Sequence, residues 1–100
     1  MIRIAICDDE KKILDEVSGY IKNYAEKKSK EIEVFRFDSA ASLIGTLEDG
    51  RTFDVFVLDV YIGDEMGTAL AGDIRKFGIE SPIIFATTSV EHAPESYETG

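Results

Sequence analysis

The chain contains a single cysteine, Cys7, among its 100 residues. One thiol cannot form a disulfide within the chain, and it does not provide the cysteine and histidine spacing of a zinc site. The residues around Cys7 are apolar, and free cysteine is among the most deeply buried residue types. We therefore predict that Cys7 is a small buried side chain.

Long hydrophobic runs are also missing. A membrane-spanning helix needs about 18 to 20 apolar residues in succession, and no stretch of the sequence approaches that length. The N-terminus lacks the basic and then apolar pattern of a secretory signal peptide. We therefore expect a soluble, cytoplasmic chain without a membrane partner. Its 44% hydrophobic content is enough for the core of one domain, and no repeat, low-complexity tract or linker divides it.

Basic residues are few: 11 lysines and arginines stand against 20 aspartates and glutamates, which gives a formal net charge of -9. Such a surface repels the phosphates of nucleic acids, so we expect no direct nucleic-acid binding by this domain. Acidic residues are also concentrated locally. Asp8, Asp9 and Glu10 are consecutive, and their mutual repulsion calls for a cation or solvent to relieve it.

The stretch from Phe53 to Asp59 organises the rest of the chain. It holds four consecutive apolar residues, is bounded by Gly50 and Gly63, and is too short for a typical helix. This pattern predicts a strand buried on both faces. Asp59 then lies at the carboxyl end of that strand, where ligands bind in open α/β sheets.

Strand and helix patterns alternate along the whole sequence. The alternation predicts an α/β fold, a doubly wound parallel sheet with helices on both faces and right-handed crossovers. The half-apolar strand after the first helix is expected at an edge of the sheet, and acids are expected in the first turn of that helix. The predicted strands are 2–7, 31–37, 53–59 and 83–86, the predicted helices are 10–28, 40–48, 68–77 and 90–100, and 60–67 is predicted to be a loop.

Four oxygen-bearing side chains follow the ends of predicted strands. If the first and third strands are neighbours, Asp8, Asp9 and Asp59 converge, with Thr87 from the next strand beside them. Oxygen ligands without a histidine or cysteine cluster indicate a hard divalent cation, and Mg²⁺ suits a site that also holds a phosphate. We predict that Asp59 is a nucleophile toward a phosphoryl group, that Asp8 and Asp9 hold the metal, and that Thr87 contacts a phosphoryl oxygen.

Three motifs now carry a family resemblance: Ile-Cys-Asp-Asp-Glu over 6–10, Val-Leu-Asp-Val-Tyr over 57–61 and Ile-Ile-Phe-Ala-Thr-Thr over 83–88. In order and spacing they resemble the acidic pair, phosphoacceptor and hydroxyl signatures of response-regulator receiver domains. The resemblance implies a flavodoxin-like (CheY-like) sheet of order 2-1-3-4-5 and phosphorylation of Asp59 by a sensor histidine kinase. It implies Mg²⁺ held by Asp9, Asp59 and the backbone carbonyl of Tyr61, with Asp8 acting largely through water. The resemblance further implies a phosphoacceptor that assists its own phosphorylation and dephosphorylation, and not an enzyme.

The first motif, together with Phe-Ala-Thr-Thr-Ser-Val-Glu-His over 85–92, is similar to receivers that precede a LytTR-type DNA-binding domain. That similarity implies a transcriptional output in another domain. Receivers continue into a fifth strand, with a lysine and an aromatic switch residue, and a last helix. The resemblance therefore implies a C-terminally truncated receiver over 1–100, and no lysine is assigned here. Its strand 83–87 would be an apolar edge, covered by a partner chain in a homodimer or a strand-exchanged dimer.

Other interpretations of the same residues remain open. Asp8 or Asp9 could be a helix N-cap and Asp59 a loop acid, without any chemistry. A phosphohydrolase with an aspartyl nucleophile usually has a second aspartate two residues later, where this chain has Tyr61. A flavodoxin-type cofactor binder needs a glycine- and hydroxyl-rich first loop, which is absent. A degenerate receiver would be an interaction module without phosphorylation.

Overall fold

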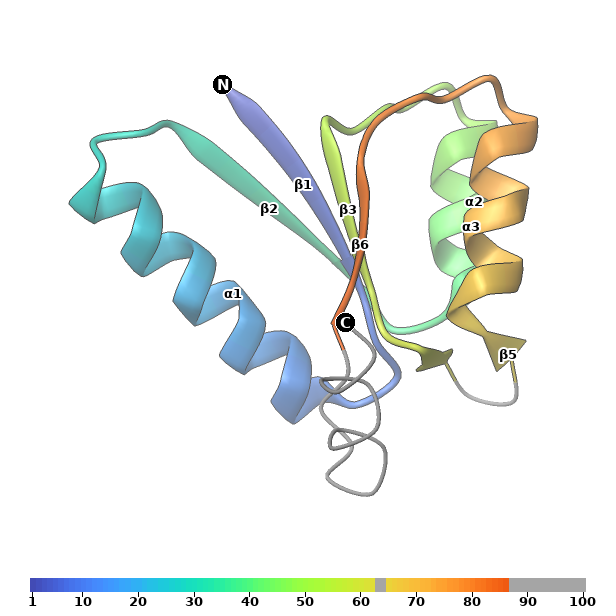
Figure 1. Ribbon diagram of the computed structural model, residues 1–100, viewed down its shortest axis with the longest axis horizontal. Helices are drawn as coiled ribbons and strands as arrows, with labels where there is room; N and C mark the ends of the chain where they lie inside the picture. Colours follow the sequence, from blue (N-terminus) through green and yellow to red (C-terminus); the bar gives the residue numbers. More distant parts are fainter. Residues whose placement is uncertain (63–64, 87–100) are drawn as a thin grey trace, which may run out of the picture.

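A parallel four-stranded sheet forms the centre of the molecule, which we describe from a computed structural model for residues 1–62 and 65–86 (Figure 1). The strands are β1 (Ile2–Cys7), β2 (Ile32–Phe37), β3 (Val55–Leu58) and β6 (Ile83–Phe85). They lie in the order β2-β1-β3-β6, so the first and third strands are neighbours and β2 is at an edge, as the sequence predicts. The helices are α1 (Lys11–Lys27), α2 (Ala40–Glu48) and α3 (Gly67–Lys76).

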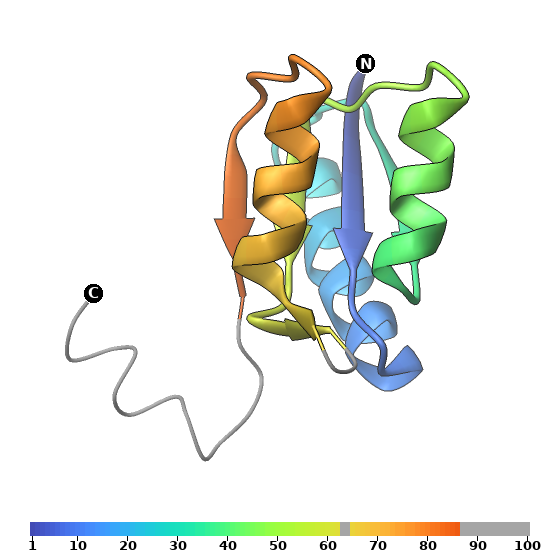
Figure 2. The same ribbon diagram turned by 90° about the vertical axis from the view of Figure 1, so that its right-hand side faces the viewer.

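Helices cover both faces of the sheet: α1 lies on one face, and α2 and α3 lie together on the other (Figures 1 and 2). This arrangement confirms the doubly wound α/β fold. The main core lies on the face covered by α2 and α3. Its buried residues are Ala5, Cys7, Leu43, Leu47, Phe53, Phe56, Leu58, Ile62, Leu70 and Ile74.

Aromatic rings anchor the chain just before β3. Phe53 precedes the strand, yet only 3% of it is exposed. Its ring meets those of Phe35, Phe37 and Phe56 edge-on, with centroids 5.2 to 5.8 Å apart. The guanidinium of Arg3 lies over the rings of Phe35 and Phe53, at 5.2 and 5.7 Å. These contacts fix the start of β3, and therefore the position at which the strand ends.

The composition of the first turn of α1 differs from the prediction. The helix begins at Lys11 and has no acidic residue in its first turn, so the prediction of acids there is wrong. Glu10 is the N-cap, in an extended conformation and without a side-chain capping bond. The reason is that β1 continues to Cys7 and the next residues form a turn, which leaves the acids in the connection. The N-cap interpretation of Asp8 and Asp9 is therefore also wrong.

The predicted loop over 60–67 contains a small hairpin. Two short strands, β4 (Tyr61–Ile62) and β5 (Glu65–Met66), pair antiparallel, with Tyr61 opposite Met66. Ile62 is 4% exposed and belongs to the core. Strands of two residues are too short for periodicity to reveal, which is why the sequence pattern reads as a loop.

The last described strand, β6, exposes apolar side chains. Ile84 and Phe85 are 52% and 42% exposed, in agreement with the apolar edge expected of this strand. The reason is that β6 pairs with β3 on one side, and no described residue pairs with its other side. The predicted helix over 90–100 lies outside the described residues. Within residues 1–62 and 65–86, no helix has the length and apolar character needed to span a membrane.

Candidate functional site

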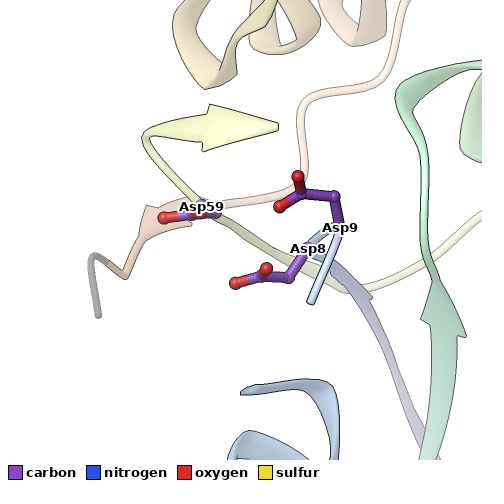
Figure 3. Close-up of side chains that lie close together, drawn as sticks. All are labelled: Asp8, Asp9 and Asp59. Atoms are coloured by element: carbon purple, nitrogen blue, oxygen red, sulfur yellow. The ribbon is translucent and has the colours of Figure 1, made fainter. Parts of the chain in front are cut away.

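Three carboxylates meet at the carboxyl edge of the sheet (Figure 3). Cys7 and Leu58 are register partners at the ends of β1 and β3, so Asp8 and Asp59 leave the sheet side by side. The amide of Asp59 donates a hydrogen bond to the carbonyl of Cys7 at 3.1 Å, which extends the pairing. Asp8, Asp9 and Asp59 each place one carboxylate oxygen within 4.8 Å of the others. The convergence predicted from sequence is present.

Two hydrogen bonds hold Asp8, one to Phe37 of β2 and one to Glu10. Its backbone N–H donates to the carbonyl of Phe37 at 3.0 Å, which extends β1 along β2. Its Oδ1 accepts a hydrogen bond from the amide of Glu10 at 2.9 Å. The residue is only 3% exposed. The turn therefore orients a buried carboxylate toward the edge of the sheet before α1 begins.

Asp59 is fixed in a similar way at the end of β3. Its Oδ1 accepts a hydrogen bond from the amide of Val60 at 2.8 Å. The preceding carbonyl, of Leu58, accepts a hydrogen bond from the amide of Ala86 at 2.9 Å. Asp59 is half-buried and Asp9 is exposed, so the cluster opens to solvent on one side. An incoming group can thus approach Asp59 without disturbing the sheet.

Burial and mutual repulsion make the ionised cluster costly. Burial raises the pKa of Asp8 to about 6; the amide of Glu10 opposes this rise, and the charges of Asp59 and Asp9 add to it. Burial also raises the pKa of Asp59. The hydrogen bond from the amide of Val60 lowers this pKa, and the charge of Asp9 raises it. For the Cys7 thiol beneath them, burial and the same acids raise the pKa to about 12.

A divalent cation fits this donor set. In the described part of the chain, the side-chain ion pairs are Arg36 with Asp15 and Lys76 with Asp73, and neither involves the three clustered aspartates. The cluster therefore holds negative charge that no described lysine, arginine or histidine neutralises. Carboxylate oxygens are the ligands preferred by hard cations such as Mg²⁺. The chemistry of the donors thus agrees with the expected metal.

Two further residues were expected at the site. Tyr61 lies in β4, two residues after Asp59, and its side chain is 44% exposed. The role of its backbone carbonyl as a metal ligand stays a prediction. Thr87 lies outside the described residues, so its contact with a phosphoryl oxygen is also a prediction.

The sequence analysis missed one residue that lies beside Asp59, Gly67. Gly67 begins α3, is buried, and donates its backbone N–H to the carbonyl of Val60 at 2.6 Å. The only signal in the sequence is a glycine near the boundary between a predicted loop and a predicted helix. Glycine is common in loops for many reasons, so this signal did not distinguish Gly67 from the other glycines.

The strand order, the acidic pair after β1 and the lone aspartate after β3 agree with the expected family. A family model for the response regulator receiver domain matches residues 4–100. The chain belongs to the receiver-domain family of response regulators. The family match confirms the resemblance inferred from the three motifs. Receiver domains are signalling domains of two-component systems and generally bind Mg²⁺ through acidic residues.

Two curated relatives are similar to this receiver. The transcriptional regulatory protein CitT of Bacillus subtilis is 30% identical over 106 residues, which cover 100% of this chain and 43% of the relative. The sensory transduction protein LytT of Bacillus cereus is 26% identical over 99 residues, which cover 98% of this chain and 38% of the relative. The receiver thus spans less than half the length of the curated relatives that it matches.

Solved structures support the same fold. A crystal structure of a response regulator receiver domain protein from Clostridium thermocellum matches with a TM-score of 0.71 and 20% sequence identity. The match covers 100% of this chain and 77% of that one. At this identity the likeness shows the fold alone, and the receiver assignment rests on the family match and on the relatives.

Proposed function

We propose that this receiver accepts a phosphoryl group on Asp59 from a sensor histidine kinase, and that the reaction depends on Mg²⁺. The observation that carries the proposal is the convergence of Asp59 with Asp8 and Asp9 at the carboxyl edge of the sheet. A lone, half-buried carboxylate at a strand end is suited to be the acceptor. The adjacent acidic pair is suited to hold a cation.

The residues divide the work as follows. Asp8, Asp9 and Asp59, with the backbone carbonyl of Tyr61, would hold Mg²⁺. When bound, the ion neutralises charge on the carboxylates and on the transferring phosphoryl oxygens. A carboxylate oxygen of Asp59 attacks phosphorus, an O–P bond forms, and the N–P bond to the kinase histidine breaks as that imidazole leaves. Thr87 would contact a phosphoryl oxygen.

Phosphorylation acts on the fold through charge. It adds roughly 1.5 to 2 negative charges to Asp59. The cluster already contains Asp8 and Asp9, and burial already disfavours its ionised form. The added charge therefore favours conformations in which Thr87 and the segment after β6 move toward the phosphoryl group. We infer that the modification shifts a pre-existing equilibrium between two signalling surfaces.

The proposal extends to the biological context. Residues 1–100 would be the receiver domain of a cytoplasmic regulator, with DNA binding in a separate output domain. CitT is named a transcriptional regulatory protein, and LytT supports the LytTR-type output. The acidic charge of -9 supports a receiver that does not bind nucleic acid itself. The apolar residues Ile84 and Phe85 at the β6 edge support a homodimer or a strand-exchanged dimer.

Asp59→Asn tests the phosphoacceptor. We expect the wild-type chain, incubated with Mg²⁺ and acetyl phosphate, to gain one labile phosphoryl group by intact mass. The adduct should be absent in the variant, because asparagine lacks the nucleophilic carboxylate, and absent without Mg²⁺. The same assay on a form extended past Gly100 completes the test. An adduct on neither form would contradict the proposal and favour a degenerate receiver that acts as an interaction module.

Asp9→Asn tests the metal ligands. Loss of one charged oxygen ligand is expected to weaken Mg²⁺ binding about tenfold or more, since loss of even an outer partner of a metal ligand typically costs about 10- to 100-fold in affinity. Isothermal titration calorimetry of the folded variant measures the affinity. Asp49→Asn is the matched control, because Asp49 is exposed at the end of α2, in the connection that precedes β3, whereas the clustered aspartates follow the ends of β1 and β3. Equal affinities for Asp9→Asn and wild type would refute the ligand assignment.

A further inference from the structure

The first residue of α3 touches the backbone of Asp59. A Cβ atom placed on Gly67 would lie 2.1 Å from the carbonyl oxygen of Asp59 and 3.2 Å from its carbonyl carbon. Real Cβ atoms essentially never approach another heavy atom to less than 3.0 Å. The neighbour is backbone and has no flexible end to move aside. Any side chain at position 67 would therefore push the Asp59 carbonyl away.

Position 67 requires glycine because no space is left for a side chain, and not because of its backbone conformation. Among the described glycines, only Gly50 and Gly78 have positive φ angles, at 92° and 78°. The backbone of Gly67 is thus one that other residues adopt readily. Gly72, five residues later in the same helix, has no atom within 4 Å of a built Cβ. Gly67 is thus buried against a neighbouring backbone, whereas Gly72 is exposed with open space around it.

Asp59 is consequently held from two sides. On one side its amide bonds to the carbonyl of Cys7 at 3.1 Å, as part of the sheet. On the other side the amide of Gly67 bonds to the carbonyl of Val60 at 2.6 Å. The segment that carries Asp59 therefore lies between β1 and the first turn of α3, in direct contact with both.

We propose that Gly67 is a positioning residue for the site: its lack of a side chain lets α3 hold the Asp59–Tyr61 backbone where the Asp59 carboxylate meets Asp8 and Asp9. This inference deepens the proposed function and rests on it for its binding readout. A side chain at position 67 displaces the carbonyl of Asp59. Since the carboxylates lie within 4.8 Å of one another, a displacement of about 1 Å is a large fraction of the geometry that a cation requires.

Gly67→Ala and Gly72→Ala form a matched pair for the test. We expect folded Gly67→Ala to bind Mg²⁺ at least tenfold more weakly than wild type in isothermal titration calorimetry, and Gly72→Ala to bind it within twofold of wild type. A purely structural role would lower the unfolding midpoint but leave the affinity of the folded protein unchanged. Wild-type affinity in folded Gly67→Ala would overturn the proposal.

A second variant separates two contacts. The built Cβ of Gly67 also lies 3.2 Å from Cε1 of Phe85, a partly exposed side chain that can move. We expect Gly67→Ala combined with Phe85→Ala to bind Mg²⁺ as weakly as Gly67→Ala alone. Recovery of wild-type affinity in the double variant would show that Phe85, and not the Asp59 backbone, transmits the effect, and would overturn the proposal.

Amide chemical shifts of the metal-free protein make the test independent of Mg²⁺. Gly67→Ala should shift the amide signals of Val60 and Tyr61, and Gly72→Ala should leave them in place. If wild type neither binds Mg²⁺ nor accepts a phosphoryl group, the proposed function fails, while unshifted Val60 and Tyr61 signals alone refute the positioning role. If Gly67→Ala does not fold, the wild-type Gly67 amide must shift on adding Mg²⁺, and an unmoved signal overturns the proposal.

Discussion

Phe56→Ala is expected to lower the free energy of unfolding by about 3 to 5 kcal/mol, as truncation of a buried phenylalanine does in other cores. Phe56 is fully buried in the centre of β3, and its ring packs edge-on against Phe53 at 5.7 Å. The substitution removes this contact and leaves a cavity beneath α2 and α3. Urea unfolding followed by circular dichroism measures the loss.

A surface aromatic provides the control for this substitution. Tyr20 lies on α1 and is 76% exposed, so Tyr20→Ala should change the free energy of unfolding by no more than about 0.5 kcal/mol. Natural domains are stable by only about 5 to 15 kcal/mol, so Phe56→Ala would remove a large share of the total. A loss below about 1 kcal/mol would mean that Phe56 does not occupy the centre of the core.

Asp8→Asn is expected to stabilise the metal-free protein at pH 7 by about 1 to 3 kcal/mol. The pKa of Asp8 is about 6 in the folded chain against an ordinary value of 3.8, and each pKa unit corresponds to about 1.4 kcal/mol. Asparagine removes the buried charge, and its Oδ1 can still accept the bond from the amide of Glu10. The same change should weaken Mg²⁺ binding.

The stability gained in Asp8→Asn should depend on pH. The folded chain binds the Asp8 proton more tightly than the unfolded chain, so wild-type stability should fall as pH rises from about 4 to about 6 and then level off. The Asp8→Asn curve should fall less, because only the raised pKa of Asp59 then contributes to that fall. The variant should therefore match wild type near pH 4 and exceed it above pH 6, in urea unfolding with a chelator present. A constant difference across this range would contradict the assigned pKa.

Together these two substitutions separate the fold from the site. Phe56 lies within the sheet and is expected to contribute to stability. Asp8 lies where a cation is expected, and its raised pKa predicts a cost to the stability of the metal-free chain. A residue that is buried at a cost to stability is understandable when it serves a ligand. The stability of the receiver should therefore rise when Mg²⁺ is added to wild type, and rise less in Asp8→Asn.

The sequence was sufficient for the parts that depend on long regular patterns. The run before Asp59 and the run before Asp8 identify two parallel strands, and parallel neighbours bring their carboxyl ends together. The convergence of the acids follows from that topology alone.

Features set by contacts between distant residues were not predictable in this way. The contact between Gly67 and the Asp59 carbonyl depends on how the hairpin of β4 and β5 returns the chain to the sheet. Nothing in a local pattern shows which glycine meets which carbonyl. The expectation of acids in the first turn of α1 was wrong because Asp8 is used in the turn before the helix, where it is buried and bonded to the amide of Glu10.

The order of the strands has a consequence for protein synthesis. The first strand to be made, β1, becomes a central strand, with residue 4 paired to residue 34 on one side and to residue 55 on the other. At roughly 5 to 20 residues per second, its second neighbour is translated several seconds later. Until then the apolar residues of β1 have a partner on one side at most. The emerging chain must therefore pass through a period in which a chaperone, or the early unit of β1, α1 and β2, protects the strand from aggregation.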